Sequence, residues 1–252
     1  MQVSGARVLV TGGARGLGRR FVLDLAAAGA RVGTCDMDAA GLDEVREQAA
    51  AQGLEVWTTM ANVAVEAEVE RLFADFAAAF GGIDAVVNNA GITRDGLLVK
   101  VKDGSVQRMS LEAWQQVIDV NLTGVFLCAR EAATHMVRQG TGGVIVSLSS
   151  ISRSGNVGQI NYTASKAGVA AMTVTLAKEL ARYGIRAAAI APGYVSTEMT
   201  EAIREDIRER IVGQIPLGRM ASMEEISHAL RFVLENDFVS GRVIEVDGAG
   251  RM

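Results

Sequence analysis

The chain has 252 residues, of which 49% are hydrophobic and 21% are charged, and its formal net charge at pH 7 is −4. This size suits one large globular domain or two small ones, and the charge balance gives no reason to expect nucleic acid or an anionic membrane as a partner. No apolar run reaches the roughly 18 residues of a membrane-spanning helix. The amino-terminal residues also lack a basic start followed by an apolar signal core, so we expect a cytoplasmic protein. Cys35 and Cys128 are too few and too far apart in sequence for a disulfide framework or a metal site.

A glycine-rich loop lies between the first expected strand and the first expected helix. The apolar run 7–11 stops at glycines 12 and 13, glycines 16 and 18 follow, and a helical pattern then continues to Gly29. Glycine lets the backbone approach a pyrophosphate closely, and the free N–H groups at a helix start attract its charge. A plain tight turn is the alternative, but it does not require glycines at all three of positions 12, 16 and 18. The loop residues predicted to bind a dinucleotide are Gly12, Arg15, Gly16, Leu17 and Gly18.

The second expected strand, residues 30–35, ends in Asp36. A carboxylate at this point of a dinucleotide site can accept hydrogen bonds from the adenosine ribose, and it repels a 2′-phosphate, so Asp36 favours NAD(H). Arg15 has the opposite effect, because its guanidinium could pair with that phosphate and allow NADP(H). As an alternative, Asp36 simply caps the following helix, a role for which Asp38 is equally suited.

Two further strands end in residues suited to the same ligand. The third strand, residues 54–60, is followed by Asn62 and Val63, where a polar side chain can meet an adenine edge or merely cap a loop. The fourth strand, residues 83–87, continues into Asn88 and a small-residue turn, where the backbone can approach a ligand closely. The turn residues predicted to line the cofactor site are Asn89, Ala90 and Gly91.

Residues 92–110 interrupt the alternation of strands and helices. Residues 100–108 are polar, charged and without a period, which predicts an exposed loop. Its basic residues could contact an anionic part of the substrate, although such clusters are more often only solvated. A helix then begins near Ser110, and it contains Asn121 and Gly124, which both cost helix stability. Residues that destabilise the element in which they lie are expected where they serve function.

Tyr162 and Lys166 carry the strongest chemical signal. They stand four residues apart in an expected long helix, so their side chains share one face. An ammonium beside a phenol stabilises the phenolate and lowers its pKa, which gives a group that can exchange a proton with a carbonyl or alcohol oxygen. Alternatively, the tyrosine caps a core helix and the lysine reaches its surface. The fifth strand, residues 142–149, ends in Ser149, with Ser147, Ser150 and Ser152 as competing candidates.

The remaining elements complete an alternating pattern. Residues 185–190 form a sixth strand before Pro192 and Gly193, residues 222–234 a helix, and residues 242–246 a seventh strand. The segment 194–220 is predicted to be a helical flap over the site. The whole pattern predicts an α/β fold, a Rossmann-type doubly wound sheet of about seven parallel strands with helices on both faces, in a single dinucleotide-binding and catalytic domain covering residues 1–252.

These residues together resemble the short-chain dehydrogenase/reductase family over essentially the whole chain. The family's glycine motif matches residues 11–18, its N-N-A-G motif matches residues 88–91, and its Y-x-x-x-K motif matches Tyr162 and Lys166. The other matching positions are the serine Ser149, the helix asparagine Asn121, the P-G pair Pro192-Gly193 and the T-x-M motif Thr197-Glu198-Met199.

The resemblance implies hydride transfer between a nicotinamide and a secondary alcohol or ketone. Tyr162 would transfer the proton, Ser149 would bind the substrate oxygen, and Lys166 would hold the ribose hydroxyls while Asn121 positions a water. The nicotinamide would lie near four residues after the sixth strand, Pro192, Gly193, Val195 and Thr197. Family members are usually tetramers, so the resemblance also implies a homotetramer.

Within the family, residues 89–95 and 155–159 look most like the 3-oxoacyl-(acyl-carrier-protein) reductases. The resemblance therefore implies a 3-hydroxyacyl/3-oxoacyl thioester or a similar ketone as substrate. Asp36 departs from this subgroup, whose NADPH-using members usually avoid an acid there, and residues 100–108 are longer than its usual connection. The subgroup's carrier-docking arginines align with Gly140 and Tyr183, next to other arginines.

Three functions are compatible with these residues. An NAD(P)(H)-dependent oxidoreductase of alcohols and ketones is the leading interpretation, and an NADPH-dependent 3-oxoacyl-carrier-protein reductase of fatty acid synthesis is the alternative among enzymes. A non-catalytic dinucleotide sensor is the alternative from another class. A sensor would be free to lose the serine, tyrosine and lysine of the site, whereas this chain retains Ser149, Tyr162 and Lys166.

Overall fold

Seven parallel strands form the central sheet, as the sequence predicts. The computed structural model describes residues 1–197, 200 and 204–250. The strands lie in the order β3-β2-β1-β4-β7-β8-β9, and each neighbouring pair is parallel. Their bounds are β1 Arg7–Thr11, β2 Arg31–Asp36, β3 Val56–Met60, β4 Ala85–Asn88, β7 Gly143–Leu148, β8 Ile185–Pro192 and β9 Val243–Val246.

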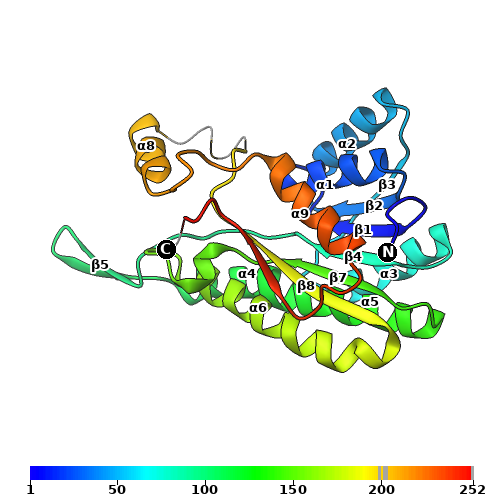
Figure 1. The fold of residues 1–252 in the computed structure, drawn as a ribbon. Coiled ribbons are helices and arrows are strands. Elements are labelled where there is room, and N and C mark those ends of the chain that lie inside the picture. The colour runs from blue at the N-terminus through cyan, green and yellow to red at the C-terminus, as the bar shows by residue number, and fades with distance from the viewer. Residues whose placement is uncertain (198–199, 201–203, 251–252) are drawn as a thin grey trace.

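Helices cover both faces of this sheet (Figure 1). The α-helices are α1 Gly16–Ala27, α2 Ala39–Ala51, α3 Glu66–Phe80, α4 Leu111–Ile118, α5 Gly124–Gln139, α6 Ile160–Leu180, α8 Glu205–Gly213 and α9 Met223–Glu235. Among the described residues, three shorter helices join them, η1 Asp119–Thr123, η2 Ile151–Ser154 and η3 Ala181–Tyr183. None of the helices in the described part of the chain is both long and apolar enough to cross a membrane.

The alternation of side chains along the strands produces two separate cores. Val8 and Val10 of β1 point to the face covered by α1 and α9, where Phe21 and Leu230 are fully buried. Leu9 between them points to the opposite face, which α3, α5 and α6 cover. Every β1 residue after the first is buried, which is typical of a parallel strand with helices on both sides.

The order of the strands places the ligand site. The chain runs from β1 outward through β2 to β3, and then returns to pair β4 with the other side of β1. Such a reversal leaves a crevice at the carboxyl ends of β1 and β4, where open parallel sheets bind their ligands. The glycine loop follows β1 and the Asn89 turn follows β4, so both lie at this crevice.

Residues 99–108 form a β-hairpin, and the expectation of an irregular loop there is wrong. Val99–Lys102 (β5) pairs antiparallel with Ser105–Arg108 (β6), across a turn at Asp103 and Gly104. Both turn residues have positive φ, 51° and 74°. Asp-Gly between alternating residues is a strong signal for such a turn, and it outweighs the polar composition.

The predicted flap falls partly outside the described residues. Within 194–220 the structure shows α8, and Val195 forms an isolated bridge with Ala221. Glu198 and Met199 of the T-x-M motif lie outside the described residues. The role of this segment as a flap stays a prediction.

Candidate active site

A cavity of about 610 Å³ lies at the carboxyl ends of β1, β2 and β4. Most of the residues that the sequence predicts for the cofactor line it, namely Gly12, Arg15, Gly16, Leu17, Gly18, Asp36, Asn62, Val63, Asn89, Ala90, Gly91 and Thr197. The predicted residues that do not line it are Tyr162, Lys166, Pro192, Gly193 and Val195. Six lining residues were not predicted, and each is a sequence or structural neighbour of one that was: Cys35, Met37, Asp38, Ala61, Ile92 and Val120.

The glycine loop packs closely on itself and on the turn after β4, because its glycines have no side chains. Gly12 has φ +71°, and a Cβ on it would lie 2.7 Å from the Cα of Ala90. A Cβ on Gly18 would lie 1.9 Å from the carbonyl oxygen of Gly12. At the start of α1, Arg15 makes no capping hydrogen bond through its side chain, so the first N–H groups of the helix remain available to an anion. These residues fit the pyrophosphate of a dinucleotide.

The turn after β4 is fastened to the glycine loop by side chains. The Asn89 amide donates to the carbonyl oxygens of Thr11 and Gly12 at 3.1 and 2.9 Å. The Thr11 hydroxyl accepts from the backbone N–H groups of Asn89 and Ala90, at 3.2 Å in both cases. The two sides of the cavity are therefore held at a fixed separation.

Asp36 and Arg15 both line the cavity, but their side chains are held differently. The Asp36 carboxylate accepts from the backbone N–H of Ala14 at 3.1 Å and from that of Met37 at 2.8 Å. The α2 helix is capped by Asp38 instead, whose carboxylate accepts from Gly41 N–H at 3.1 Å. The Arg15 side chain is exposed and has no hydrogen bond or ion pair with the described residues. The carboxylate is thus fixed at the end of β2, and the guanidinium is free to move.

The polar groups of Asn62 are partly engaged in hydrogen bonds within its own loop. Its side-chain oxygen accepts from the N–H of Ala64 at 3.0 Å, and its backbone N–H donates to Glu68 at 2.9 Å. The loop-capping alternative is therefore one function of this residue. It lines the cavity nevertheless, next to Val63.

Tyr162 and Lys166 lie on one face of α6, as their spacing predicts. The Lys166 ammonium lies 5.5 Å from the centre of the Tyr162 ring and donates to the carbonyl oxygen of Leu148 at 2.7 Å. Only 4% of Lys166 is exposed, and this burial lowers its pKa to about 8. The lysine thus joins α6 to the end of β7.

The pKa of Tyr162 changes in the direction opposite to the expected one. Burial raises it above its ordinary value, while a hydrogen bond with the Ser150 side chain acts to lower it. Removing the phenolate from water outweighs the favourable contacts, because no full ion pair compensates for the lost hydration. Tyr162 therefore remains a protonated phenol at neutral pH, which is the state of a proton donor.

The two serines at the end of β7 have different partners. The Ser149 side chain is turned inward, since its hydroxyl donates to the main-chain oxygen of Lys166 at 2.9 Å and only 3% of the residue is exposed. The side chain of Ser150, the next residue, is close enough to the Tyr162 phenol to act on its pKa, which it lowers. Its hydroxyl also accepts from the N–H of Ser152 at 3.1 Å. The hydroxyl beside the phenol is thus that of Ser150, one of the competing candidates in the sequence.

Asn121 lies in a turn of π-helix between α4 and α5, where the sequence shows residues unfavourable to a helix. Its side-chain oxygen accepts from Ile92 N–H at 2.8 Å, and its amide donates to Ile92 O at 2.9 Å and contacts the Ser165 hydroxyl at 3.5 Å. The residue is fully buried. It therefore connects the wall of the cavity to α6, and positioning a water stays a prediction.

The segment after β8 lies against the carboxyl end of β9. Gly193 N–H donates to Val246 O at 2.9 Å, and Val195 O accepts from the Thr200 hydroxyl at 2.9 Å. Thr197 reaches the lining of the cavity. Contact of Pro192, Gly193 and Val195 with a nicotinamide stays a prediction.

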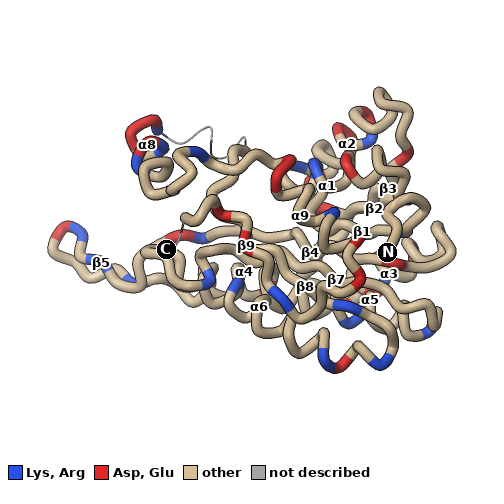
Figure 2. Tube along the Cα trace, in the orientation of Figure 1, with Lys and Arg blue, Asp and Glu red and all other residues tan. Residues whose placement is uncertain are grey.

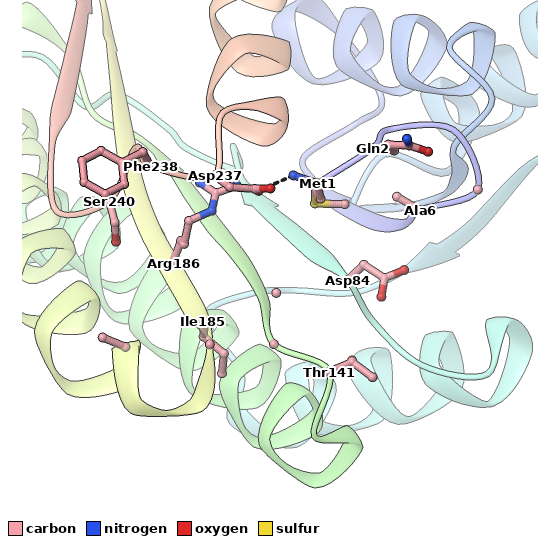
Figure 3. Close-up of a pocket in the computed structure, with 15 residues that line it drawn as sticks. Met1, Gln2, Ala6, Asp84, Thr141, Ile185, Arg186, Asp237, Phe238 and Ser240 are labelled. Atoms are coloured by element: carbon pink, nitrogen blue, oxygen red, sulfur yellow. Dashed lines mark hydrogen bonds and ion pairs between the residues drawn. The ribbon is translucent and has the colours of Figure 1, made fainter.

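A second cavity, of about 750 Å³, opens at the amino ends of the strands (Figure 3). Its charged side chains already form hydrogen bonds or ion pairs with other groups of the protein. Arg186 donates to the carbonyl oxygens of Val233, Leu234 and Val239 at 3.0, 2.9 and 2.8 Å. Asp84, also in the lining, accepts from Arg7 Nε at 2.8 Å. The reaction therefore stays predicted at the carboxyl ends of the strands, although the cavity there is smaller.

Comparison with known proteins agrees with this fold and site. Residues 6–208 match the family model described as short chain dehydrogenase, so the chain belongs to that family. It is accordingly an oxidoreductase that acts on alcohol or ketone groups with NAD(P)(H). The sensor alternative finds no support in this match.

Several similar relatives carry the name 3-oxoacyl-[acyl-carrier-protein] reductase. The relative from Staphylococcus epidermidis is 38% identical over 95% of this chain and 96% of its own length. The one from Thermotoga maritima is 39% identical over 98% of both chains. The one from Synechocystis sp. is 42% identical over 95% of this chain and 94% of its own length.

Proposed function

We propose that the chain catalyses reversible hydride transfer between NAD(H) and a 3-oxoacyl/3-hydroxyacyl thioester or a similar ketone. The observation that carries this proposal is the group formed by Tyr162, Ser150 and Lys166, in a chain whose glycine loop lines a cavity suited to a dinucleotide. A bound nicotinamide would supply the hydride to the carbonyl carbon or accept it from the alcohol. The names of the relatives support an acyl thioester as the substrate class.

Tyr162 acts as the acid in the reducing direction. Its buried phenol keeps its proton at neutral pH, and it gives this proton to the carbonyl oxygen as the hydride reaches the carbon. The Lys166 cation near the ring then stabilises the phenolate that remains. In the oxidising direction the phenolate takes the proton back from the alcohol.

Ser150 binds the substrate oxygen in this proposal, in place of Ser149. A hydrogen-bond donor beside the phenol stabilises the charge that develops on the oxygen during reduction. The Ser150 side chain lies beside the Tyr162 phenol and lowers its pKa, whereas the Ser149 hydroxyl is directed at the backbone of Lys166. Ser149 then has the positioning role of holding β7 against α6.

Turnover of a small thioester tests the proposed function. We expect the purified protein to reduce a 3-oxoacyl thioester of N-acetylcysteamine, followed by the near-ultraviolet absorbance of the reduced nicotinamide. The assay is run separately with NADH and with NADPH. The absence of turnover with both cofactors, while simple ketones are reduced, would contradict the thioester class and leave the chemistry in place.

Asp36 sets the preference for NAD(H). Its carboxylate is fixed at the end of β2, where a 2′-phosphate would face it. We expect Asp36→Ala to lower the ratio of kcat/KM for NADH over NADPH roughly tenfold, equivalent to about 1.4 kcal/mol. Asp38→Ala is the matched control, because it removes the neighbouring carboxylate that caps α2. An unchanged ratio in Asp36→Ala would leave the alternative, an NADPH-dependent 3-oxoacyl-carrier-protein reductase with Arg15 at the phosphate.

We further propose a cytoplasmic homotetramer as the working form of the protein. Its support is the resemblance to the family and the similarity to the named relatives. Sedimentation velocity of the purified chain measures the assembly directly. A monomer at working concentration would contradict it.

A further inference from the structure

The β5–β6 hairpin, residues 99–108, extends beyond the body of the molecule (Figure 1). Every residue in both of its strands is exposed. A two-stranded hairpin by itself is only marginally stable in water. This exposed element therefore offers both of its faces to a partner.

The two faces of the hairpin differ in chemistry. Directly paired residues of an antiparallel ladder lie on the same face. Val101 pairs with Val106, and these side chains are 73% and 67% exposed, while Val99 pairs with Arg108 on the same face, so this face is apolar apart from the arginine at its base. Lys100 pairs with Gln107 and Lys102 pairs with Ser105, which makes the other face basic. An exposed apolar face beside a cationic face is suited to contact with a protein.

The charges of the hairpin have no partner within the chain. The side chains of Lys100, Lys102 and Arg108 form no hydrogen bond or ion pair with any described residue. Two of the four lysines in the sequence lie here, although the chain as a whole has a net charge of −4. Figure 2 shows these basic positions along the hairpin. Asp103 at the turn is the single acidic residue of the hairpin, so its net charge is positive. Two hairpins facing each other in a symmetric contact between copies would repel, whereas an acidic partner would be attracted.

Residues 94–96, which lead into the hairpin, are bonded to the segment that precedes Tyr162. Gly96 N–H donates to Gly158 O at 2.7 Å, and the Gln159 amide donates to Asp95 at 2.9 Å. The Asn161 amide donates to the carbonyl oxygen of residue 94 at 3.0 Å. The start of the hairpin is therefore anchored to the segment that leads to the proposed proton donor.

We propose that the β5–β6 hairpin is a docking arm for an acidic carrier protein that presents the acyl group as a thioester. This inference rests on the proposed function. Lys100 and Lys102 attract the acidic surface of the carrier, and Val101 and Val106 contact an apolar part of it. Because opposite charges increase the rate of encounter, the effect is seen in KM for the carrier-bound substrate and is weakened by salt.

Kinetics on two substrates test the docking arm. The double variant Lys100→Glu/Lys102→Glu is compared with the parent, using one 3-oxoacyl group on an acyl carrier protein and the same group on N-acetylcysteamine. We expect KM for the carrier-bound substrate to rise roughly tenfold, within the range of electrostatic steering, with kcat unchanged. Both constants for the small thioester stay as in the parent. Lys178→Glu, at an exposed lysine of α6, is the matched control and changes neither substrate.

Different outcomes contradict different proposals. An equal loss on both substrates, or no loss on the carrier-bound one, overturns the docking arm. A double variant that sediments as a smaller assembly than the parent also overturns it, because the hairpin then contacts a second copy of the chain. A parent that reduces neither thioester contradicts the proposed function instead.

Lysine labelling tests the contact without any turnover. The protein is acetylated with and without the acidic carrier, and the modification of each lysine is measured by mass spectrometry. We expect the carrier to protect Lys100 and Lys102 and to leave Lys178 unprotected. Equal labelling of all three exposed lysines at saturating carrier would overturn the docking arm.

Discussion

The two ends of the sheet differ in how their polar groups are used. At the amino ends, the larger cavity is lined by Arg186 and Asp84, and both are engaged with partners from the protein itself. At the carboxyl ends, the smaller cavity has an uncapped helix start and the exposed side chain of Arg15, which has no partner among the described residues. Cavity volume alone would therefore favour the end whose polar groups are already engaged by the protein.

A binding site is therefore marked by polar groups that have few partners within the fold and can contact a ligand. Arg186 satisfies three carbonyl oxygens near the end of α9, so its charge stabilises the fold. Lys166 is buried more deeply than Arg186, yet it is joined to one carbonyl oxygen and lies against a phenol. Burying a cation with so few partners is unfavourable for folding, and it is expected where chemistry requires it.

The largest effect should come from Tyr162→Phe, which removes the proton donor and keeps the ring. We expect kcat for ketone reduction to fall by roughly 10²–10⁴, the usual range for losing a general acid. Dinucleotide binding, measured by calorimetry, should stay unchanged because Tyr162 does not line the cofactor cavity. Tyr183→Phe, next to the cavity at the amino ends, is the control and should keep full activity. A Tyr162→Phe variant as fast as the parent would remove the proposed chemistry from this end of the sheet.

The two serines provide the next largest contrast. Ser150→Ala should lower kcat/KM roughly a hundredfold, since a hydrogen-bond donor to the developing oxyanion is lost. Ser149→Ala should keep kcat and lower the free energy of unfolding by about 1 kcal/mol, because it loses only a bond to the backbone. Steady-state kinetics and urea unfolding measure both effects. The reverse pattern would return the catalytic role to Ser149.

The serine pair marks the limit of what the sequence could predict. Seven parallel strands, the glycine loop and the Tyr162–Lys166 spacing follow from local patterns, because strand periodicity and helix spacing are properties of short segments. The choice between adjacent serines depends on the residue at which β7 ends, which is Leu148. A shift of one residue there reverses which hydroxyl faces the phenol.

The hairpin turn and the pKa of Tyr162 also differ from the sequence-based predictions, each for its own reason. The Asp103-Gly104 turn was readable in the sequence, since an Asp-Gly pair between alternating residues predicts a hairpin, but the polar composition obscured it. The direction of the Tyr162 pKa shift could not be read, because it results from burial by segments distant in sequence. The four-residue spacing of Tyr162 and Lys166 indicates that the lysine attracts the phenolate. It does not show the larger effect, which is the loss of water around the phenolate on burial.

A smaller effect is expected at the other end of the sheet. Arg186→Met should lower the free energy of unfolding by about 2 kcal/mol, because it leaves buried carbonyl oxygens without their donor. In a chain of this size that corresponds to a fall in Tm of about 4–8 °C. The kcat/KM for a ketone should not change. Calorimetry and kinetics on one sample measure both, and a selective loss of turnover would mean that the larger cavity takes part in the reaction.

The smallest effect concerns the pH dependence of stability that Lys166 contributes. Its pKa is about 8 in the folded chain and 10.5 when unperturbed, so between these values the unfolded chain binds more protons. Stability from this group therefore increases as pH rises through about 8, by about 1 kcal/mol between pH 7 and 9. Urea unfolding of the parent and of Lys166→Met at several pH values isolates it by difference, since methionine removes the titration and retains the burial. Parallel curves would show that the lysine is as well solvated as an exposed one. The carboxyl end would then hold no destabilising charge, and the contrast with Arg186 would disappear.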